Sequence, residues 1–136
     1  MQDKPFIHFV VPGYVIPKAR ARVVNGHAYT PKRTMIYERE IAVLGSLEMG
    51  GHELLECPVR IEVVASFTEP KAISKRLKGT LRGRPYMGRS DWDNIGKVAC
   101  DSLNGIVYRD DRQIVDATVR KIYGAVRQLE ISIWKA

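Results

Sequence analysis

Five of the fifteen acidic residues of this 136-residue chain fall within the 21 positions from 91 to 111, although the formal net charge of the chain is +7. Carboxylates a few ångströms apart repel one another, and a bound divalent cation is the usual means of neutralising them. The crowding therefore predicts a metal site. The positive charge of the remaining chain predicts that the partner is a polyanion.

The length and composition narrow the class of protein. We expect a single domain over residues 1–136, because a chain of this length can bury one core but not two. No apolar run approaches the roughly 20 residues of a membrane span, and the first residues have no secretory pattern. Cys57 and Cys100 are isolated thiols. Their spacing from each other and from the three histidines does not match a zinc-binding site. We therefore expect a cytoplasmic protein with no membrane contact and no small-molecule cofactor.

Basic residues gather in two segments that contain no acid. Residues 14–33, the first basic segment, hold five Lys and Arg, and residues 71–90, the second basic segment, hold seven, out of 22 in the chain. One such run is usually a solvated loop, but two of them ahead of an acidic cluster favour contact with phosphates. The predicted DNA contacts are Lys18, Arg20, Arg22, Lys32, Arg33, Lys75, Arg76, Lys78, Arg82, Arg84 and Arg89.

Other residues of these segments suggest two further properties. Glycines and a proline in the second basic segment indicate a mobile loop that could close over a bound strand. Aromatic residues interleaved with the basic ones could stack on unpaired bases or pack at the rim of the core. These aromatic residues are Tyr14, Tyr29, Tyr86 and Trp92.

The first half of the chain predicts a strand, a helix and a second strand. Residues 6–11 are mostly apolar, and Thr30-Pro31 is typical of a helix start, with threonine as the cap and proline in the first turn. Residues 59–67 mostly alternate between apolar and polar side chains, with Val64 as the one apolar residue on the polar side, as expected of a half-buried strand. The helix is expected to end at Gly50-Gly51, and its apolar face is expected to comprise Tyr37, Ile41, Leu44 and Leu47.

The acidic segment opens a second helix, which ends at Asn104-Gly105 and has Ile95, Ala99 and Leu103 on its apolar face. Gly96 lowers the stability of that helix by roughly 1 kcal/mol and allows close packing. Strands are expected over about 113–123 and over 128–133. The order β-α-β-α-β-β predicts a small α+β domain with a mixed, mostly antiparallel sheet.

The acidic residues suit phosphodiester chemistry. Asp93, Lys97 and Asp101 stand at i, i+4 and i+8, so they share one stripe of the expected helix, and Asp110 and Asp111 arrive from the following turn. Oxygen ligands of this kind suit Mg²⁺, which keeps water molecules that a phosphate can replace. The metal would activate an attacking water, and Lys97 would neutralise charge that develops on the phosphate.

The same residues also have a structural interpretation, in which the aspartates only cap a helix, pair with Lys97 and make a turn. An EF-hand is excluded, because Ser102 stands where that loop requires a bidentate glutamate. Cys100 lies beside the apolar face of the helix and is expected to be a buried hydrophobe, not a nucleophile.

Residues 91–105 read Asp-x-Asp-Asn-x-x-Lys-x-x-x-Asp-x-Leu-Asn-Gly, and residues 110–114 read Asp-Asp-x-Gln-Ile. These strings closely resemble the signature of the RusA family of Holliday junction resolvases, and residues 13–31 resemble its N-terminal loop more weakly. The resemblance implies that the catalytic carboxylates that bind Mg²⁺, with Mn²⁺ as a substitute, are Asp91, Asp93 and Asp111.

The resemblance also implies that Lys97 is the catalytic lysine. Asp101 matches the pattern and is given a supporting role, such as fixing Lys97, while Asp110 is a further candidate ligand. Family members are small endonucleases, common in prophages and bacteriophages. They act as homodimers, because a four-way junction needs two symmetric nicks.

The leading hypothesis is a homodimeric, Mg²⁺-dependent endonuclease that resolves Holliday junctions in DNA recombination and repair. One alternative is a less selective nuclease acting on forks or flaps. Another is a non-catalytic protein that binds branched DNA. The second alternative leaves the acidic segment unexplained, because a module that only binds phosphates gains nothing from carboxylates that repel them.

Overall fold

The structure, a computed structural model, describes residues 4–136 and has the mixed α and β content that the sequence predicts. No helix in this part of the chain is both long enough and apolar enough to span a bilayer. In chain order the elements are β1 (Ile7–Pro12), β2 (Arg22–Val24), β3 (His27–Tyr29), α1 (Lys32–Met49), β4 (Val59–Phe67), α2 (Trp92–Ser102), the 3-10 turn η1 (Asp111–Gln113), β5 (Ile114–Tyr123) and β6 (Gln128–Lys135).

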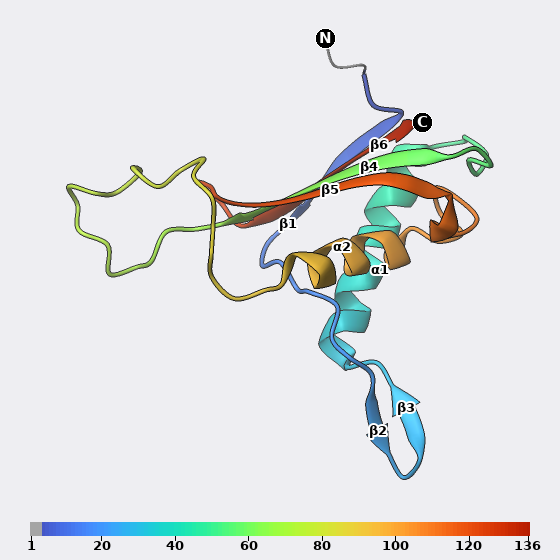
Figure 1. Ribbon diagram of the computed structural model, residues 1–136, viewed down its shortest axis with the longest axis horizontal. Coiled ribbons are helices and arrows are strands. Elements are labelled where there is room, and N and C mark those ends of the chain that lie inside the picture. Colours follow the sequence, from blue (N-terminus) through green and yellow to red (C-terminus); the bar gives the residue numbers. More distant parts are fainter. Residues whose placement is uncertain (1–3) are drawn as a thin grey trace.

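Four strands form one mixed sheet in the order β1-β6-β4-β5. Strand β6 pairs antiparallel with both β1 and β4, whereas β4 and β5 are parallel. The parallel pair requires a crossover, which α2 provides, and both helices lie on the same face of the sheet (Figure 1). The predicted α+β class with a mixed sheet is confirmed.

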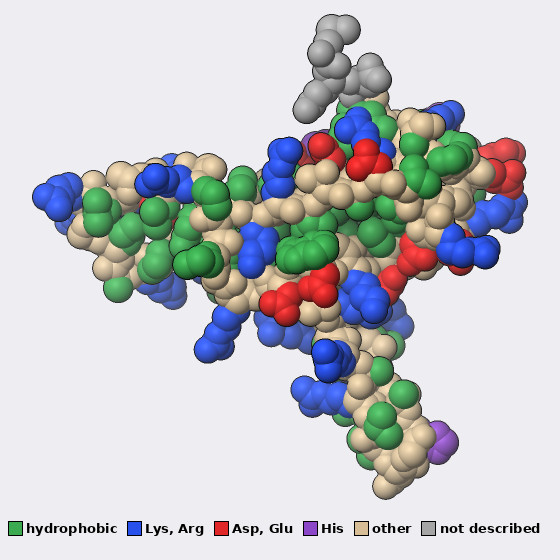
Figure 2. All heavy atoms as spheres, in the orientation of Figure 1, with side chains coloured by type: hydrophobic (Ala, Val, Ile, Leu, Met, Phe, Trp, Pro, Cys, Tyr) green, Lys and Arg blue, Asp and Glu red, His purple; other side chains and the backbone are tan. Residues whose placement is uncertain are grey.

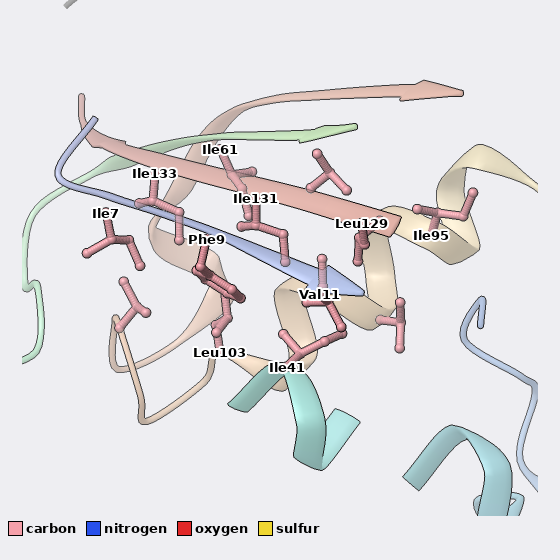
Figure 3. Close-up of a cluster of buried hydrophobic side chains, with 14 of the residues drawn as sticks. Ile7, Phe9, Val11, Ile41, Ile61, Ile95, Leu103, Leu129, Ile131 and Ile133 are labelled. Atoms are coloured by element: carbon pink, nitrogen blue, oxygen red, sulfur yellow. The ribbon is translucent and has the colours of Figure 1, made fainter. Parts of the chain in front are cut away.

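The core lies between this sheet and the two helices. Because side chains alternate along a strand, every second residue of β1, β4 and β6 faces the helices. Figure 3 shows these side chains meeting Ile41 of α1, Ile95 of α2 and Leu103, the C-cap residue of α2. All three of these residues are fully buried. The opposite face of the sheet is more polar and carries, for example, the guanidinium of Arg60 at 4.0 Å from the centre of the Trp134 ring.

Helix α1 follows its predicted range, but one predicted core residue is wrong. Tyr37 and Ile41 are buried as expected, whereas the side chain of Leu47 is 73% exposed and Met49 is buried instead. The helix contacts the core along one line of i, i+4 positions, and Leu47 lies on the opposite side. The helix also lacks the predicted threonine cap, because its N-cap is Pro31 and no side chain bonds there.

A β-hairpin, formed by β2 and β3, interrupts the first basic segment. Its turn residues Asn25 and Gly26 have φ values of 51° and 79°, which two-residue hairpin turns require. The patterns described above do not predict this hairpin, although Asn-Gly is a strong signal for it. All of its residues are exposed, and it projects away from the body beyond the start of α1 (Figure 1).

The second basic segment is more ordered than a plain loop. The carboxylate of Glu69 accepts hydrogen bonds from the backbone N–H groups of Gly79 (2.7 Å) and Leu81 (3.2 Å). Residues 83–86 then run beside β5, with Pro85 bridged to Ile122 in antiparallel fashion. The segment therefore projects from the end of β4 but returns to the sheet before α2 begins (Figure 1).

Gly45 sets how closely α1 approaches α2, because a Cβ atom there would lie 2.7 Å from Cδ2 of the buried Leu103. Replacing Gly45 with valine is expected to lower the free energy of unfolding by about 1–3 kcal/mol, as overpacking does. The matched change at its exposed neighbour, Ser46→Val, should stay within about 0.5 kcal/mol. Urea unfolding measures both, and equal values would contradict the tight contact.

Candidate functional site

Helix α2 presents the first two aspartates of the acidic segment at its N-terminal end. Asp91 is the N-cap residue, with extended backbone, but its side chain makes no capping hydrogen bond. Asp93 lies in the first turn, where the helix dipole favours a carboxylate. Both side chains are exposed. The structural interpretation in which these aspartates cap the helix therefore does not account for them.

The other aspartates meet at the opposite end of α2. The turn η1 places the carboxyl of Asp111 beside those of Asp101 and Asp110. Partial burial, together with these two acidic neighbours, raises the pKa of Asp111. A raised pKa shows that the group holds its proton more readily than a free aspartate does. A cation placed beside Asp111 would reverse the effect, because it favours the ionised form.

Asp110 and Asp111 differ in what their carboxyls already bind. The Asp110 carboxylate accepts a hydrogen bond from the backbone N–H of Arg112 at 2.8 Å, which lowers the pKa of Asp110. The side chain of Gln113 completes this capping box and also donates to the carbonyls of Leu55 and Cys57. Asp110 thus has a structural task in the turn, which favours Asp111 as the ligand.

The two groups of aspartates are separated along α2. Asp91 and Asp101 are ten residues apart, which corresponds to about 15 Å of helix axis. Within residues 4–136, no three or more Asp, Glu, His or Cys side chains are arranged so that they could hold one metal ion. The fold brings Asp111 to Asp101, but it does not gather Asp91, Asp93 and Asp111 around a single point in one chain.

Lys18 is placed differently from the other predicted DNA contacts. Its ammonium lies 2.9 Å from the carboxylate of Glu38 in α1 and 3.4 Å from that of Asp101, and its side chain is only 22% exposed. Partial burial opposes the charge, but the bond to Glu38 and the two carboxylates together raise the pKa of Lys18. Lys18 therefore neutralises acids within the protein.

The expected pairing of Asp101 with Lys97 is absent from the described part of the chain. Asp101 faces Lys18, while Lys97 is exposed and lies within 4.0 Å of no carboxylate of residues 4–136. The ammonium of Lys97 is consequently available to an external anion. Cys100 is partly buried against the core, and this burial raises the pKa of its thiol to about 12.

The remaining predicted DNA contacts are all exposed. Figure 2 shows Lys and Arg side chains along the projection of the second basic segment and near the base of the hairpin, with acidic side chains on the body between them. The two basic segments also meet α2 directly. The second one ends at Ser90, directly before Asp91, and the first crosses the helix where the N–H of Lys18 donates to the carbonyl of Asn94 at 2.9 Å.

The four interleaved aromatic residues divide into two groups. Tyr86 stacks on Phe67, with ring centres 4.0 Å apart, so it packs against the protein. The other three are exposed, although the guanidinium of Arg127 lies over the ring of Tyr14 at 4.3 Å. Only the exposed rings could stack on unpaired bases without rearrangement; they are Tyr14, Tyr29 and Trp92.

Lys121, on β5, contacts the entrance of the acidic segment, and the sequence patterns do not reveal this contact. Its ammonium donates to the carbonyls of Gly88 and Ser90, just before Asp91. A single lysine in a strand carries no signal of its own. This contact exists only because β5 lies beside residues 83–90.

Comparison with known proteins gives two matches. A family model described as Endodeoxyribonuclease RusA matches residues 12–134, which include both basic segments and the whole acidic segment. The chain is also 30% identical over 138 residues to the uncharacterized protein YqaN of Bacillus subtilis (strain 168). That alignment covers 93% of this chain and 94% of YqaN.

Replacing Lys18 with methionine is expected to destabilise the protein, because Glu38 and Asp101 then lose their shared cation. The loss should be about 1–3 kcal/mol, between the values for exposed and fully buried ion pairs. Urea unfolding measures it. Arg20→Met, at an exposed position, should instead leave stability unchanged. It should lower the slope of the logarithm of the DNA-binding constant against the logarithm of the salt concentration by about one unit. The reverse pattern would make Lys18 a DNA contact.

Replacing Asp111 with asparagine is expected to raise the melting temperature of the metal-free protein at neutral pH. Its pKa is raised in the folded state, so the ionised carboxylate disfavours folding at every pH above that pKa. This increase in melting temperature should shrink as the pH falls through the raised pKa of Asp111, and it should vanish below the ordinary aspartate pKa of 3.8. Melting curves between about pH 3 and pH 7 test this, with the exposed Asp116→Asn as the control. A gain that does not depend on pH would exclude the electrostatic cause.

Proposed function

Because the chain belongs to the RusA family of endodeoxyribonucleases, we propose that it resolves Holliday junctions as a homodimer, with Mg²⁺ or alternatively Mn²⁺ as its metal. It would make paired, symmetric nicks in four-way junctions during recombination and repair. The observation that carries this proposal is the position of α2. The helix displays exposed carboxylates and the exposed side chain of Lys97 where the two basic segments meet the body.

The proposed metal ligands are the carboxylates of Asp91, Asp93 and Asp111. The chemistry of this donor set suits the ion, because Mg²⁺ prefers oxygen ligands. Burial and two acidic neighbours raise the pKa of Asp111, and a divalent cation beside the carboxyl would offset both effects. When bound, Mg²⁺ lowers the pKa of an attacking water and orients the scissile phosphate. Since α2 keeps Asp91 and Asp111 apart, the set is proposed to close around the ion only in the homodimer on DNA.

Lys97 and the basic segments have separate tasks in this proposal. Lys97 neutralises negative charge that develops on the phosphate during hydrolysis, and its exposure, with no carboxylate of residues 4–136 in ion-pair contact, supports that role. The exposed basic residues hold the strands by contacts to phosphates, which carry no sequence information. The two-fold symmetry of a homodimer supplies two such sites for the two strands that must be cut.

The proposed function is tested with a labelled four-way junction and a matched linear duplex, each with and without Mg²⁺. Paired nicks in the junction alone, and only with the metal, are expected. Equal cleavage of forks, flaps and junctions would favour the less selective nuclease. Salt-dependent binding without any cleavage would leave a non-catalytic binding protein.

In the same assay, Asp93→Asn should reduce cleavage at least about 100-fold, because a charged group that acts in the transition state is lost. Binding of the junction should be unchanged or tighter, since a negative charge facing phosphates is removed. Asp116→Asn removes the same charge from an exposed position outside the acidic segment and should cleave as the wild type does. Full activity of Asp93→Asn would exclude Asp93 from the catalytic set.

A further inference from the structure

The end of the second basic segment is attached to β5 by backbone hydrogen bonds. The N–H of Gly83 donates to the carbonyl of Tyr123 (2.8 Å), and the N–H of Tyr123 donates to that of Arg84 (2.9 Å). The N–H of Tyr86 donates to the carbonyl of Lys121 at 2.9 Å. Residues 83–86 thereby extend the sheet beyond the second half of β5.

Aromatic packing secures the same attachment. The ring of Tyr86 lies parallel to that of Phe67 at 4.0 Å, and the ring of Tyr123 meets it edge-on at 5.2 Å. Gly88 has no room for a side chain, because a Cβ atom there would overlap the hydroxyl of Tyr86. The chain at Gly88 therefore packs closely against the Tyr86 ring, while Met87 between them is 95% exposed.

The next residues make an unfavourable turn into α2. Ser90 has a φ value of 90°, which a residue other than glycine rarely adopts. Such a conformation persists only where the surrounding structure holds it. Ser90 is followed directly by Asp91, the N-cap of α2 and a proposed metal ligand. Whatever holds Ser90 therefore also determines where the backbone of Asp91 lies.

Lys121 is the side chain that holds this turn. Its ammonium donates to the carbonyl of Ser90 at 2.8 Å and to that of Gly88 at 3.2 Å, so one group ties two carbonyls on either side of residue 89. It also lies 5.7 Å from the centre of the Tyr86 ring, within reach of a cation–π attraction. Lys121 belongs to β5, a strand of the main sheet. Its hydrogen bonds therefore attach the turn to a rigid part of the fold.

We propose that Lys121 is a positioning residue, which fixes residues 88–90 and thereby sets Asp91 for binding of the divalent metal. The inference rests on the proposed function, since it gives Asp91 the role of a ligand. Groups that orient metal ligands change metal affinity or activity by about 10- to 100-fold when they are removed. The role belongs to the metal-free protein too, because the contacts of Lys121 are all within the chain.

The test compares Lys121→Met, which keeps the length of the side chain but removes its donors, with Lys121→Arg, which restores donors. Arg120→Met removes the same charge from the neighbouring exposed position of β5 and serves as the control. In Lys121→Met, the Mg²⁺ concentration for half-maximal junction cleavage should rise at least about 10-fold. Junction binding in Ca²⁺ should change less than about twofold, because no phosphate contact is lost. Lys121→Arg should recover most of the metal affinity.

Two readouts do not depend on cleavage. Binding of Mn²⁺, followed by electron paramagnetic resonance on the junction complex, should weaken in Lys121→Met by a similar factor and stay unchanged in Arg120→Met. Hydrogen exchange of the backbone amides of residues 88–92 should become faster in the metal-free variant. Should Lys121→Met fail to fold, Lys121→Gln keeps one donor and is measured in its place.

The outcomes separate this inference from the function on which it rests. Unchanged metal dependence and unchanged exchange in Lys121→Met would overturn the positioning role, while wild-type cleavage still stood. A loss of junction affinity with unchanged metal dependence would make Lys121 a phosphate contact instead, which also overturns it. Absence of Mg²⁺-dependent cleavage and of metal binding in the wild type would overturn the proposed function itself, and with it the claim about Asp91.

Discussion

The burial of one face of α2 against the sheet is the interaction on which the rest of the site depends. Ile95, Val98 and Ala99 are fully buried. Gly96 approaches β5 so closely that a Cβ atom there would lie 3.1 Å from Cγ2 of Val119. This close approach favours glycine at position 96 despite its poor helix propensity. It also fixes the rotation of the helix, so that Asp93 and Lys97 face outward.

Charged side chains hold the basic segments to this core through a few internal contacts. Lys18 ties the first basic segment to both helices. The carboxylate of Glu69 accepts hydrogen bonds from backbone N–H groups within the second basic segment. Lys121 fixes the point where the second segment enters α2. Only a few of the charged side chains of the basic segments make such internal contacts. The majority remains exposed and gives the surface its attraction for phosphates.

Local patterns predicted much of the fold because they report which side of an element is buried. The alternation over residues 59–67 gave β4 its correct range, and the spacing of Ile95, Ala99 and Leu103 gave the buried face of α2. The prediction that Leu47 belongs to the apolar face of α1 was wrong. Apolar residues at helical spacing do not show which of two neighbouring rows of side chains on the helix packs against the core. The hairpin at Asn25-Gly26 was missed among residues that favour a loop.

The sequence by itself determined the family, the elements of the main sheet and the identity of the acidic segment, because each is written in residues close together along the chain. The tertiary structure alone decided that Asp101 faces Lys18, that Asp111 meets Asp101, and that Lys121 lies beneath the turn before Asp91. These contacts join residues of different elements. Their distances follow from how α1, α2 and β5 pack, and that packing is set by the shapes of whole faces, which no local spacing records.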